Sequence, residues 1–319
     1  MQYTLQKEVF SNFVDSVKKN HEFIAPVLKN RSSFKKIESS EEIYFKENTY
    51  FPVKGYFFKD REVLLEFDGN KITENKLKPN KKVIFGIRRC DLNGILHQEI
   101  VFVEEHPDPY FMARRSATIL IGLHCKEGTK YCFCNSFELK DYFDLMFYDK
   151  GDFYAIEVGT PKGEDFIKAF KKFFKEEKNI ITQEDKKIKN KMSLKYLNIA
   201  RHYDNEKWKK GSDKCISCGA CNFLCPNCHC FSIEDEVDFS LKKGKRIRTP
   251  ASCQLRHFTR VAGDHVFRDA KLARFKHRIY HQMQYFKDRH DINFCTGCGR
   301  CIEGCPAKID WVKIINGLH

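Results

Sequence analysis

Two short runs of cysteine constrain this sequence more than any other feature. Residues 215–226 read CISCGACNFLCP and residues 295–306 read CTGCGRCIEGCP, so both follow the pattern C-x2-C-x2-C-x3-C-P. Three thiolates spaced by three residues can bind three corners of one iron–sulfur cube, and the glycines between them let backbone N–H groups approach its sulfides. The runs therefore predict two [4Fe–4S] clusters.

The fourth cysteine of each run decides how the two clusters are shared. In paired runs of this form it binds the cluster of the other run. We therefore assign to the first cluster Cys215, Cys218, Cys221 and Cys305. We assign to the second cluster Cys295, Cys298, Cys301 and Cys225.

Structural zinc and a disulfide scaffold are the alternative uses of so many thiols. Zinc normally takes two separated ligand pairs, whereas here four cysteines fall within eleven residues, twice. The chain has 15 cysteines, an odd number that leaves one thiol unpaired in any full disulfide scheme. The N-terminus, MQYTLQKEVFSNF, lacks the apolar stretch of a secretion signal, and no apolar run approaches the roughly 20 residues that span a bilayer. These observations predict a cytoplasmic protein whose reduced thiols bind metal.

A chain of 319 residues is long enough for two domains. Residues 1–205 predict an α/β domain, with helices near 5–19 and 163–177 and a solvated, lysine-rich helical connector at 175–195. Its predicted strands are EVLLEF, KVIFGI, TILIGL, FDLMFYD and DFYAIEVG. Residues 206–319 predict a bacterial-type two-cluster ferredoxin-like α+β domain.

A helical insert at 231–294 separates the two cysteine runs. Its second half predicts a helix with one apolar face, formed by Leu272, Phe275, Ile279, Met283 and Phe286. The other faces carry basic residues: Lys271, Arg274, Lys276, Arg278 and Lys287. We interpret this pattern as a core stripe with a solvated basic face rather than as a dedicated docking helix.

A third set of cysteines lies in the predicted α/β domain: Cys90, Cys125, Cys132 and Cys134. The first two follow the strands KVIFGI and TILIGL, and adjacent parallel strands bring their carboxyl ends to one edge of a sheet. Four thiolates at that edge would hold a third [4Fe–4S] cluster, with buried structural cysteines as the alternative. Nearby arginines either offset the cluster charge or are plain surface residues: Arg88, Arg89, Arg114 and Arg115.

Cys228, Cys230 and Cys253 belong to none of these sets. They either pack beside the first cluster and tune it through hydrogen bonds, or supply three ligands of a further metal site. In the second case the fourth ligand would be His229 or His265. We favour the first interpretation.

Taken together, the motifs resemble those of the iron–sulfur A subunit of anaerobic sulfite reductase, which is related to the β subunit of sulfhydrogenase-type nickel–iron hydrogenases. The matching stretches are RRCDLNGI, PYFMARR, YCFCNSF, KCISCGACNFLCPNCHCFSI, ASC, VAGDHVFRD and CTGCGRCIEGCPAKI. The third cysteine set recurs in that family. One departure is CFCNSFEL, where the family usually has CFCxSMGT, so the loop after Cys134 is expected to differ in shape.

The resemblance implies a cytoplasmic complex in which a flavin subunit oxidises NADH and a sirohaem subunit reduces sulfite to sulfide. This chain would relay single electrons between them and would have no catalytic residues of its own. No G-x-G-x-x-G follows a strand and no P-loop occurs, so we expect neither flavin nor nicotinamide here. The alternative within the resemblance is the same relay in a sulfhydrogenase-type hydrogenase.

An alternative of another class is a metal-stabilised basic module that binds nucleic acid. The formal charge of +14 permits that function. Each cluster with its four thiolates carries about −2, so three clusters would lower the net charge to about +8. The remaining positive charge suits acidic partner proteins equally well, and the cysteine spacing favours the electron relay.

Overall fold

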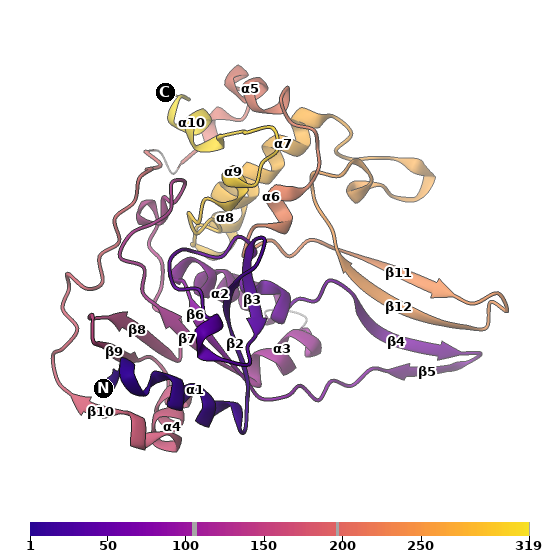
Figure 1. Ribbon diagram of the computed structural model, residues 1–319. Coiled ribbons are helices and arrows are strands. Elements are labelled where there is room, and N and C mark those ends of the chain that lie inside the picture. Colours follow the sequence, from indigo (N-terminus) through magenta and orange to yellow (C-terminus); the bar gives the residue numbers. More distant parts are fainter. Residues whose placement is uncertain (104–106, 196–197, 319) are drawn as a thin grey trace. The chain divides into compact units, whose positions relative to one another are not determined.

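The computed structural model describes residues 1–103, 107–195 and 198–318, and it divides into two compact units (Figure 1). Unit 1 comprises residues 1–53, 79–192 and 296–298, and unit 2 comprises residues 54–78, 193–295 and 299 onward. This division differs from the predicted boundary at 205/206. Residues 54–78 belong to unit 2 because their strands pair with a strand near residue 245.

Unit 1 is built on an eight-stranded mixed sheet in the order β10-β1-β9-β8-β7-β6-β2-β3. The central strands β2, β6, β7 and β8 run parallel, and the other pairings are antiparallel. The predicted α/β region is therefore confirmed. The strands are β1 Gln2–Gln6, β2 Glu22–Leu28, β3 Ser32–Lys36, β6 Lys82–Ile87, β7 Thr118–Leu123, β8 Leu145–Asp149, β9 Phe153–Val158 and β10 Lys175–Glu177.

Helices cover both faces of this sheet. The helices of unit 1 are α1 Phe10–Lys18, α2 Arg89–Val103, α3 Pro109–Ser116 and α4 Pro161–Ala169. The helices α1 and α4 lie side by side in Figure 1, and their phenylalanines share one buried cluster with alternate residues of the central strands, such as Phe85 and Ile121. On the opposite face α2 packs on β7, where a Cβ at Gly122 would lie 3.1 Å from the Leu92 side chain. Burial on both faces explains why these strands are continuously apolar.

Three predictions for unit 1 need correction. The helix predicted over 5–19 spans only 10–18, because residues 2–6 form the strand β1, which pairs with both β9 and β10. The helix predicted over 163–177 ends at Ala169, and β10 follows it. No α-helix lies within 178–195 in the part of the chain that the structure describes, so the helical connector was wrong. Its lysines pair with scattered acidic residues, as Lys186 does with Glu157 at 2.6 Å.

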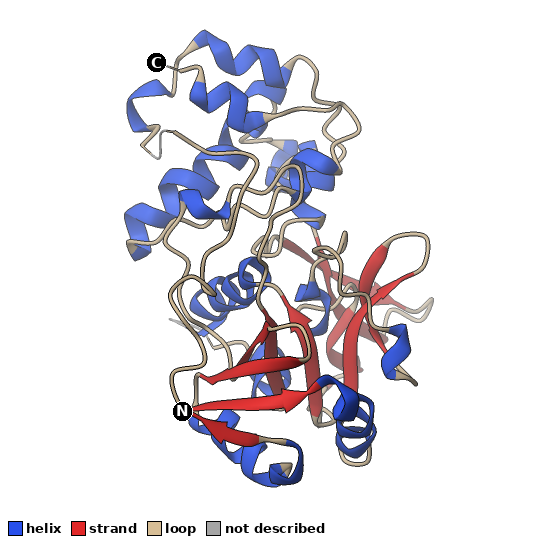
Figure 2. Ribbon diagram, turned by 60° about the vertical axis from the view of Figure 1, so that its left-hand side comes forward, coloured by secondary structure: helices blue, strands red, loops and turns tan. Residues whose placement is uncertain are grey.

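Unit 2 combines a four-stranded antiparallel sheet with short helices around the cysteine runs. The sheet has the order β11-β12-β4-β5, with β4 Glu62–Asp68, β5 Lys71–Glu74, β11 Phe231–Val237 and β12 Lys243–Pro250. Thus EVLLEF does form a strand, but in this sheet and not in the α/β sheet. The helices are α5 Lys209–Ser212, α6 Ala220–Phe223, α7 Lys271–Tyr280, α8 Phe286–His290, α9 Arg300–Glu303 and α10 Trp311–Asn316. Figure 2 shows these helices as short segments joined by long loops.

The predicted basic helix of the insert is present as α7 and α8, joined by a π-helical turn at His281–Tyr285. Its apolar stripe is buried, as predicted, at Phe275, Ile279, Met283 and Phe286. The basic face is not solvated as a whole, since Arg274, Lys276 and Arg278 are less than 10 % exposed. Because a buried cation needs an anionic or hydrogen-bonding partner, these residues point to a polar interior beside the cysteine runs.

Candidate iron–sulfur centres

The first cysteine run forms a loop around one wall of a cavity in unit 2. Five cysteines line this cavity: Cys215, Cys218, Cys221, Cys301 and Cys305. Four of them are the thiols that the sequence assigned to the first cluster, whereas Cys301 was assigned to the second, and the five come from two stretches about 80 residues apart in the chain. The loop turns through left-handed conformations at Ser217 and Gly219. It then enters α6.

The cavity offers the donors that an iron–sulfur cluster requires. The backbone N–H groups of Ser217 and Ile309 lie 3.4 Å from the sulfurs of Cys215 and Cys305, respectively. Burial raises the pKa of the Cys221 thiol well above its usual range. A thiol in such surroundings ionises readily only when a metal replaces its proton. The residues present therefore fit a thiolate-bound cluster.

A buried arginine supplies the strongest electrostatic evidence for an anion at this cavity. Arg278 lines the cavity, is 8 % exposed, and donates from Nη2 to the carbonyl of Cys221 at 3.2 Å. Its Nε is buried and has no hydrogen-bond partner among the described residues, and the groups that raise its pKa most are the thiols of Cys228, Cys225, Cys221 and Cys301. The thiols raise the pKa of Arg278, even though burial alone would lower it. An uncompensated buried charge costs several kcal/mol, so the site calls for ionised sulfur.

The second run has a different setting. Cys295 is buried, and its backbone N–H donates to the main-chain carbonyl of Gln282 at 3.1 Å. The indole Nε1 of Trp311 donates to the sulfur of Cys301 at 3.2 Å. Residues 296–298, and with them Cys298, belong to unit 1, whereas Cys225, Cys295 and Cys301 belong to unit 2. The assignment of Cys225, Cys295, Cys298 and Cys301 to one cluster therefore stays a prediction.

Two cysteines of the third set, Cys90 and Cys125, lie at the carboxyl ends of parallel strands, as the sequence predicted. β6 and β7 pair in parallel; Cys90 follows β6 in the first turn of α2, and Cys125 follows β7 by two residues. Besides burial, the charges of Cys132 and Cys125 raise the pKa of Cys134. Burial raises the pKa of Cys134 to about 11.

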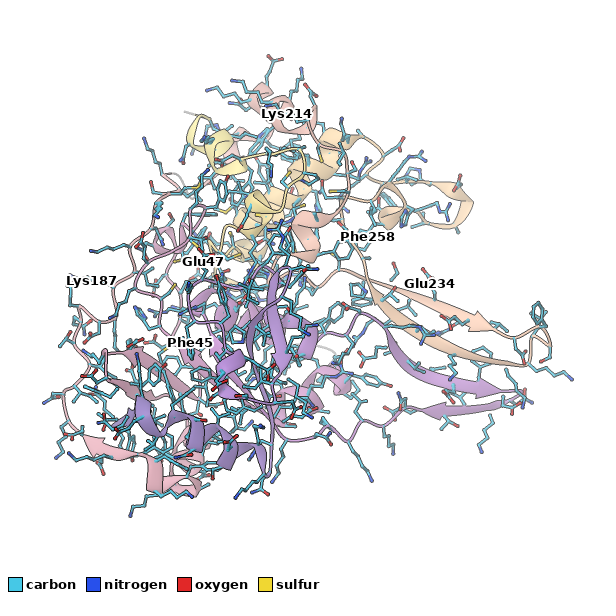
Figure 3. All side chains as sticks on the ribbon, viewed as in Figure 1. Phe45, Glu47, Lys187, Lys214, Glu234 and Phe258 are labelled. Carbon is cyan, nitrogen blue, oxygen red and sulfur yellow. The ribbon has the colours of Figure 1, made fainter. Side chains whose placement is uncertain are left out.

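Two polar groups near this set favour an anion there. Arg88 is buried and donates to the carbonyls of His124 and of Phe45, which is labelled in Figure 3. Burial raises the pKa of Cys125, and the charge of Arg88 lowers it. The Nδ2 of Asn190 is buried without a partner beside Cys134, whose sulfur lies 3.4 Å from the Asn190 Oδ1. Two other arginines named from the sequence pair with carboxylates: Arg89 with Asp141, and Arg115 with Glu99.

Cys228 and Cys253 are buried around the side chain of Asn222. The amide Nδ2 of Asn222 lies 3.2 Å from the sulfur of Cys253 and 3.6 Å from that of Cys228. Lys54 donates to the backbone carbonyls of Asn222 and Cys228, both at 3.0 Å. These contacts support the hydrogen-bonding interpretation.

The alternative of a further metal ion stays a prediction. Within the described residues no three His, Cys, Asp or Glu side chains are already arranged as the ligands of one ion, and this holds for the assigned cluster ligands as well. His265, one of the two suggested fourth ligands, is exposed. His229 approaches the carbonyl of Asn227 at 3.3 Å.

The sequence analysis missed Arg278 and Lys54 as parts of the centre. A signal for Arg278 exists, because it directly precedes a residue of the apolar stripe, Ile279, and lies four residues after Arg274. Residues three or four apart share a helix face, so a buried arginine pair was foreseeable. Lys54 lies about 160 residues before the first run in the sequence, and no local pattern marks it.

Two general expectations can be checked directly. All 15 cysteines are free of disulfide bonds. In the described part of the chain, none of the helices has the length and apolar character needed to cross a membrane.

Comparison with known proteins identifies the cysteine-rich region and relates the whole chain to one protein. A family described as a 4Fe-4S dicluster domain matches residues 214–309. Sulfhydrogenase 2 subunit beta of Pyrococcus furiosus is 32 % identical over 336 residues, which covers 99 % of this chain and 97 % of that protein. The F420-dependent formate dehydrogenase subunit beta of Methanocaldococcus jannaschii is 27 % identical over 133 residues, or 42 % of this chain and 27 % of that protein. No solved structure matches.

These findings bear out the coarser predictions. The dicluster match supports iron–sulfur clusters in a ferredoxin-like C-terminal region, and both relatives are subunits of oxidoreductase complexes. The sulfhydrogenase side of the predicted resemblance is shown, whereas the sulfite reductase side is not. The chain therefore belongs to the family of iron–sulfur electron-transfer subunits that includes the β subunit of sulfhydrogenase 2.

Proposed function

We propose that this chain relays single electrons between the other subunits of a cytoplasmic, sulfhydrogenase-type oxidoreductase. When bound, each [4Fe–4S] cluster accepts and releases one electron at a time. Cys215, Cys218, Cys221 and Cys305 hold the first cluster, and Cys295, Cys298, Cys301 and Cys225 hold the second. Cys90, Cys125, Cys132 and Cys134 hold a third. The chain has no catalytic residues for substrate conversion.

The observation that carries this proposal is the cavity lined by five cysteines and one buried arginine. Its thiols come from both runs, as the exchange of the fourth ligand requires. Arg278 faces thiols of both runs, including Cys221 and Cys301. A fixed positive charge beside the sulfurs stabilises the reduced, more negative form of a cluster, so Arg278 would raise the reduction potential.

The partners follow from what the chain lacks and from its relatives. Since its sequence holds no dinucleotide-binding motif, a separate flavin subunit would exchange electrons with a nicotinamide. The full-length similarity to a sulfhydrogenase subunit favours a nickel–iron hydrogenase subunit on the other side. The second candidate partner is a sirohaem sulfite reductase subunit, because the cysteine motifs also resemble those of the A subunit of anaerobic sulfite reductase.

Anaerobic isolation of the native complex, through a tag on this chain, tests the proposal and separates the two partners. Stoichiometric nickel and reduction of the clusters by hydrogen would support the hydrogenase complex. Sirohaem and sulfite-dependent oxidation of the clusters would support the sulfite reductase complex. A colourless protein that contains zinc and co-purifies with nucleic acid would contradict both and favour the basic binding module.

Iron and acid-labile sulfide in the isolated chain test the number of clusters. About 12 iron atoms per chain correspond to three clusters, and about 8 correspond to two. The lower value would make Cys90, Cys125, Cys132 and Cys134 structural thiols and would leave the relay through the two runs intact.

A further inference from the structure

The loop that carries Cys132 and Cys134 lies directly against the second cysteine run. The backbone N–H of Phe133 donates to the carbonyl of Gly297 at 2.8 Å. The sulfur of Cys132 lies 3.5 Å from the carbonyl oxygen of Cys298. All of these residues belong to unit 1, and Phe133 is 1 % exposed. A predicted ligand of the second cluster therefore contacts a predicted ligand of the third.

Gly297 allows this approach. Its φ is +66°, and a side chain there would place its Cβ 2.6 Å from the backbone N and Cα of Cys134. The corresponding position of the first run is Ser217, which has a φ of +55° and does carry a side chain. The left-handed backbone of the run thus accepts a residue other than glycine. What requires glycine at position 297 is the close contact with the Cys134 loop.

We propose, on the basis of the proposed function, that the second and third clusters form a direct electron-exchange pair whose approach is set by Gly297. The path runs from the sulfur of Cys298 through the covalent bonds of that residue to its carbonyl oxygen, and then across 3.5 Å to the sulfur of Cys132. One electron leaves one site, which is oxidised, and enters the other, which is reduced. No bond forms or breaks and no proton moves.

In this proposal electrons pass between the first and second clusters and between the second and third. The first and second sites are linked by the exchanged fourth ligands, Cys225 and Cys305. The third site is linked to the second by the contact between Cys132 and Cys298. The third cysteine set is therefore an end of the relay.

The decisive measurement uses the full-length chain with Cys218→Ser, which removes the first cluster and leaves about 8 iron atoms. In the dithionite-reduced protein, electron paramagnetic resonance reports whether the two remaining clusters interact magnetically. We expect a split or broadened spectrum from two coupled spins. A simple sum of two isolated signals would overturn the proposal while leaving the electron relay itself unaffected.

A pair of matched variants tests Gly297. Gly297→Ser gives the second run the residue that the first run has, and Ser217→Gly makes the reverse change. Both variants should retain the iron of the native protein, about 12 atoms. We expect Gly297→Ser to reduce the splitting between the second and third clusters by at least half, and Ser217→Gly to leave it unchanged. Equal splitting in both variants would refute the role of Gly297.

The iron content separates failure of this inference from failure of the proposed function. A native chain with about 8 iron atoms has no third cluster, and the exchange pair is then excluded together with that part of the function. A native chain with about 12 iron atoms and uncoupled second and third clusters contradicts the exchange pair alone.

Discussion

The two cysteine runs have the same spacing but very different surroundings. In the first run Ile216 is 65 % exposed, whereas Thr296 at the same position of the second run is 2 % exposed. Cys218 is exposed, and its counterpart Cys298 lies against the Cys132 loop. Cluster geometry thus sets the spacing of the thiols, but it does not determine which residues cover them. In our proposal the covered run passes electrons within the chain.

The largest effect is expected from removal of a ligand in the covered run. Cys298→Ser should lose about 4 iron atoms and abolish electron transfer to an external acceptor, while the α/β unit stays folded because its core does not include this thiol. Iron analysis, circular dichroism and acceptor reduction measure the three results. The control is Cys253→Ser, a buried thiol that is not an assigned ligand. Unchanged electron transfer in Cys298→Ser would break the comparison.

A smaller effect is expected away from the thiols, in the four-stranded sheet of unit 2. Arg248 and Glu62 form a buried ion pair at 2.5 Å, with side chains 5 % and 3 % exposed. Glu62→Gln removes the carboxylate that pairs with the buried Arg248, which should lower the free energy of unfolding by about 3–5 kcal/mol.

The exposed pair of Lys245 and Glu66 provides the control for Glu62→Gln. Glu66→Gln should cost no more than about 1 kcal/mol, because solvent screens the pair. Denaturant unfolding measures both variants, and iron content should change in neither. Equal destabilisation of the two variants would contradict the buried pair.

Next in size is the effect of the arginine that faces thiols of both runs. Arg278→Gln removes a positive charge beside the clusters, so adding an electron becomes less favourable. We expect the equilibrium constant for reduction to fall about tenfold, which shifts the reduction potential by about 59 mV to more negative values. Spectroscopic redox titration measures it.

Arg274→Gln is the matched control on the same helix. Arg274 is also buried, but it donates to the carbonyls of Gln254 and Arg268 instead of facing the sulfurs. Equal shifts of potential in Arg274→Gln and Arg278→Gln would show that helix packing, and not charge, causes the effect.

The smallest effect concerns a histidine next to the second run. The ring of His281 lies 5.2 Å from that of Phe294, which precedes Cys295, and burial lowers the pKa of His281 to about 3. The folded state keeps His281 neutral, whereas the unfolded chain binds a proton below about pH 6.5. Stability should therefore fall as the pH decreases below that value, by about 1.4 kcal/mol at pH 5.5 for one such group.

His281→Phe should reduce this pH dependence, because phenylalanine keeps the ring contact and cannot bind a proton. The free energy of unfolding at pH 7 and pH 5.5 measures the difference. His257→Phe, at an exposed position, should leave the pH dependence unchanged. The same slope in His281→Phe and the native chain would exclude His281 as the cause.

Much of the fold could be read from short segments. The strands KVIFGI and TILIGL are buried, parallel neighbours as predicted, because continuous apolar runs of this length are typical of sheets covered on both faces. The lysine-rich segment 175–195 was misread because helical propensity is a weak prior, and pairing of β10 with β1 overrides it. EVLLEF was recognised as a strand but placed in the wrong sheet, since its partner β12 lies about 180 residues later.

By itself the sequence determined which thiols are available and how they are spaced, because a cluster draws most of its ligands from about ten consecutive residues. It also determined that the N-terminal half forms an α/β sheet. Only the tertiary structure decided that Arg278 is buried against the sulfurs and that Gly297 meets the Cys134 loop. Such contacts join segments far apart in the chain, and no local pattern of residues encodes burial between them.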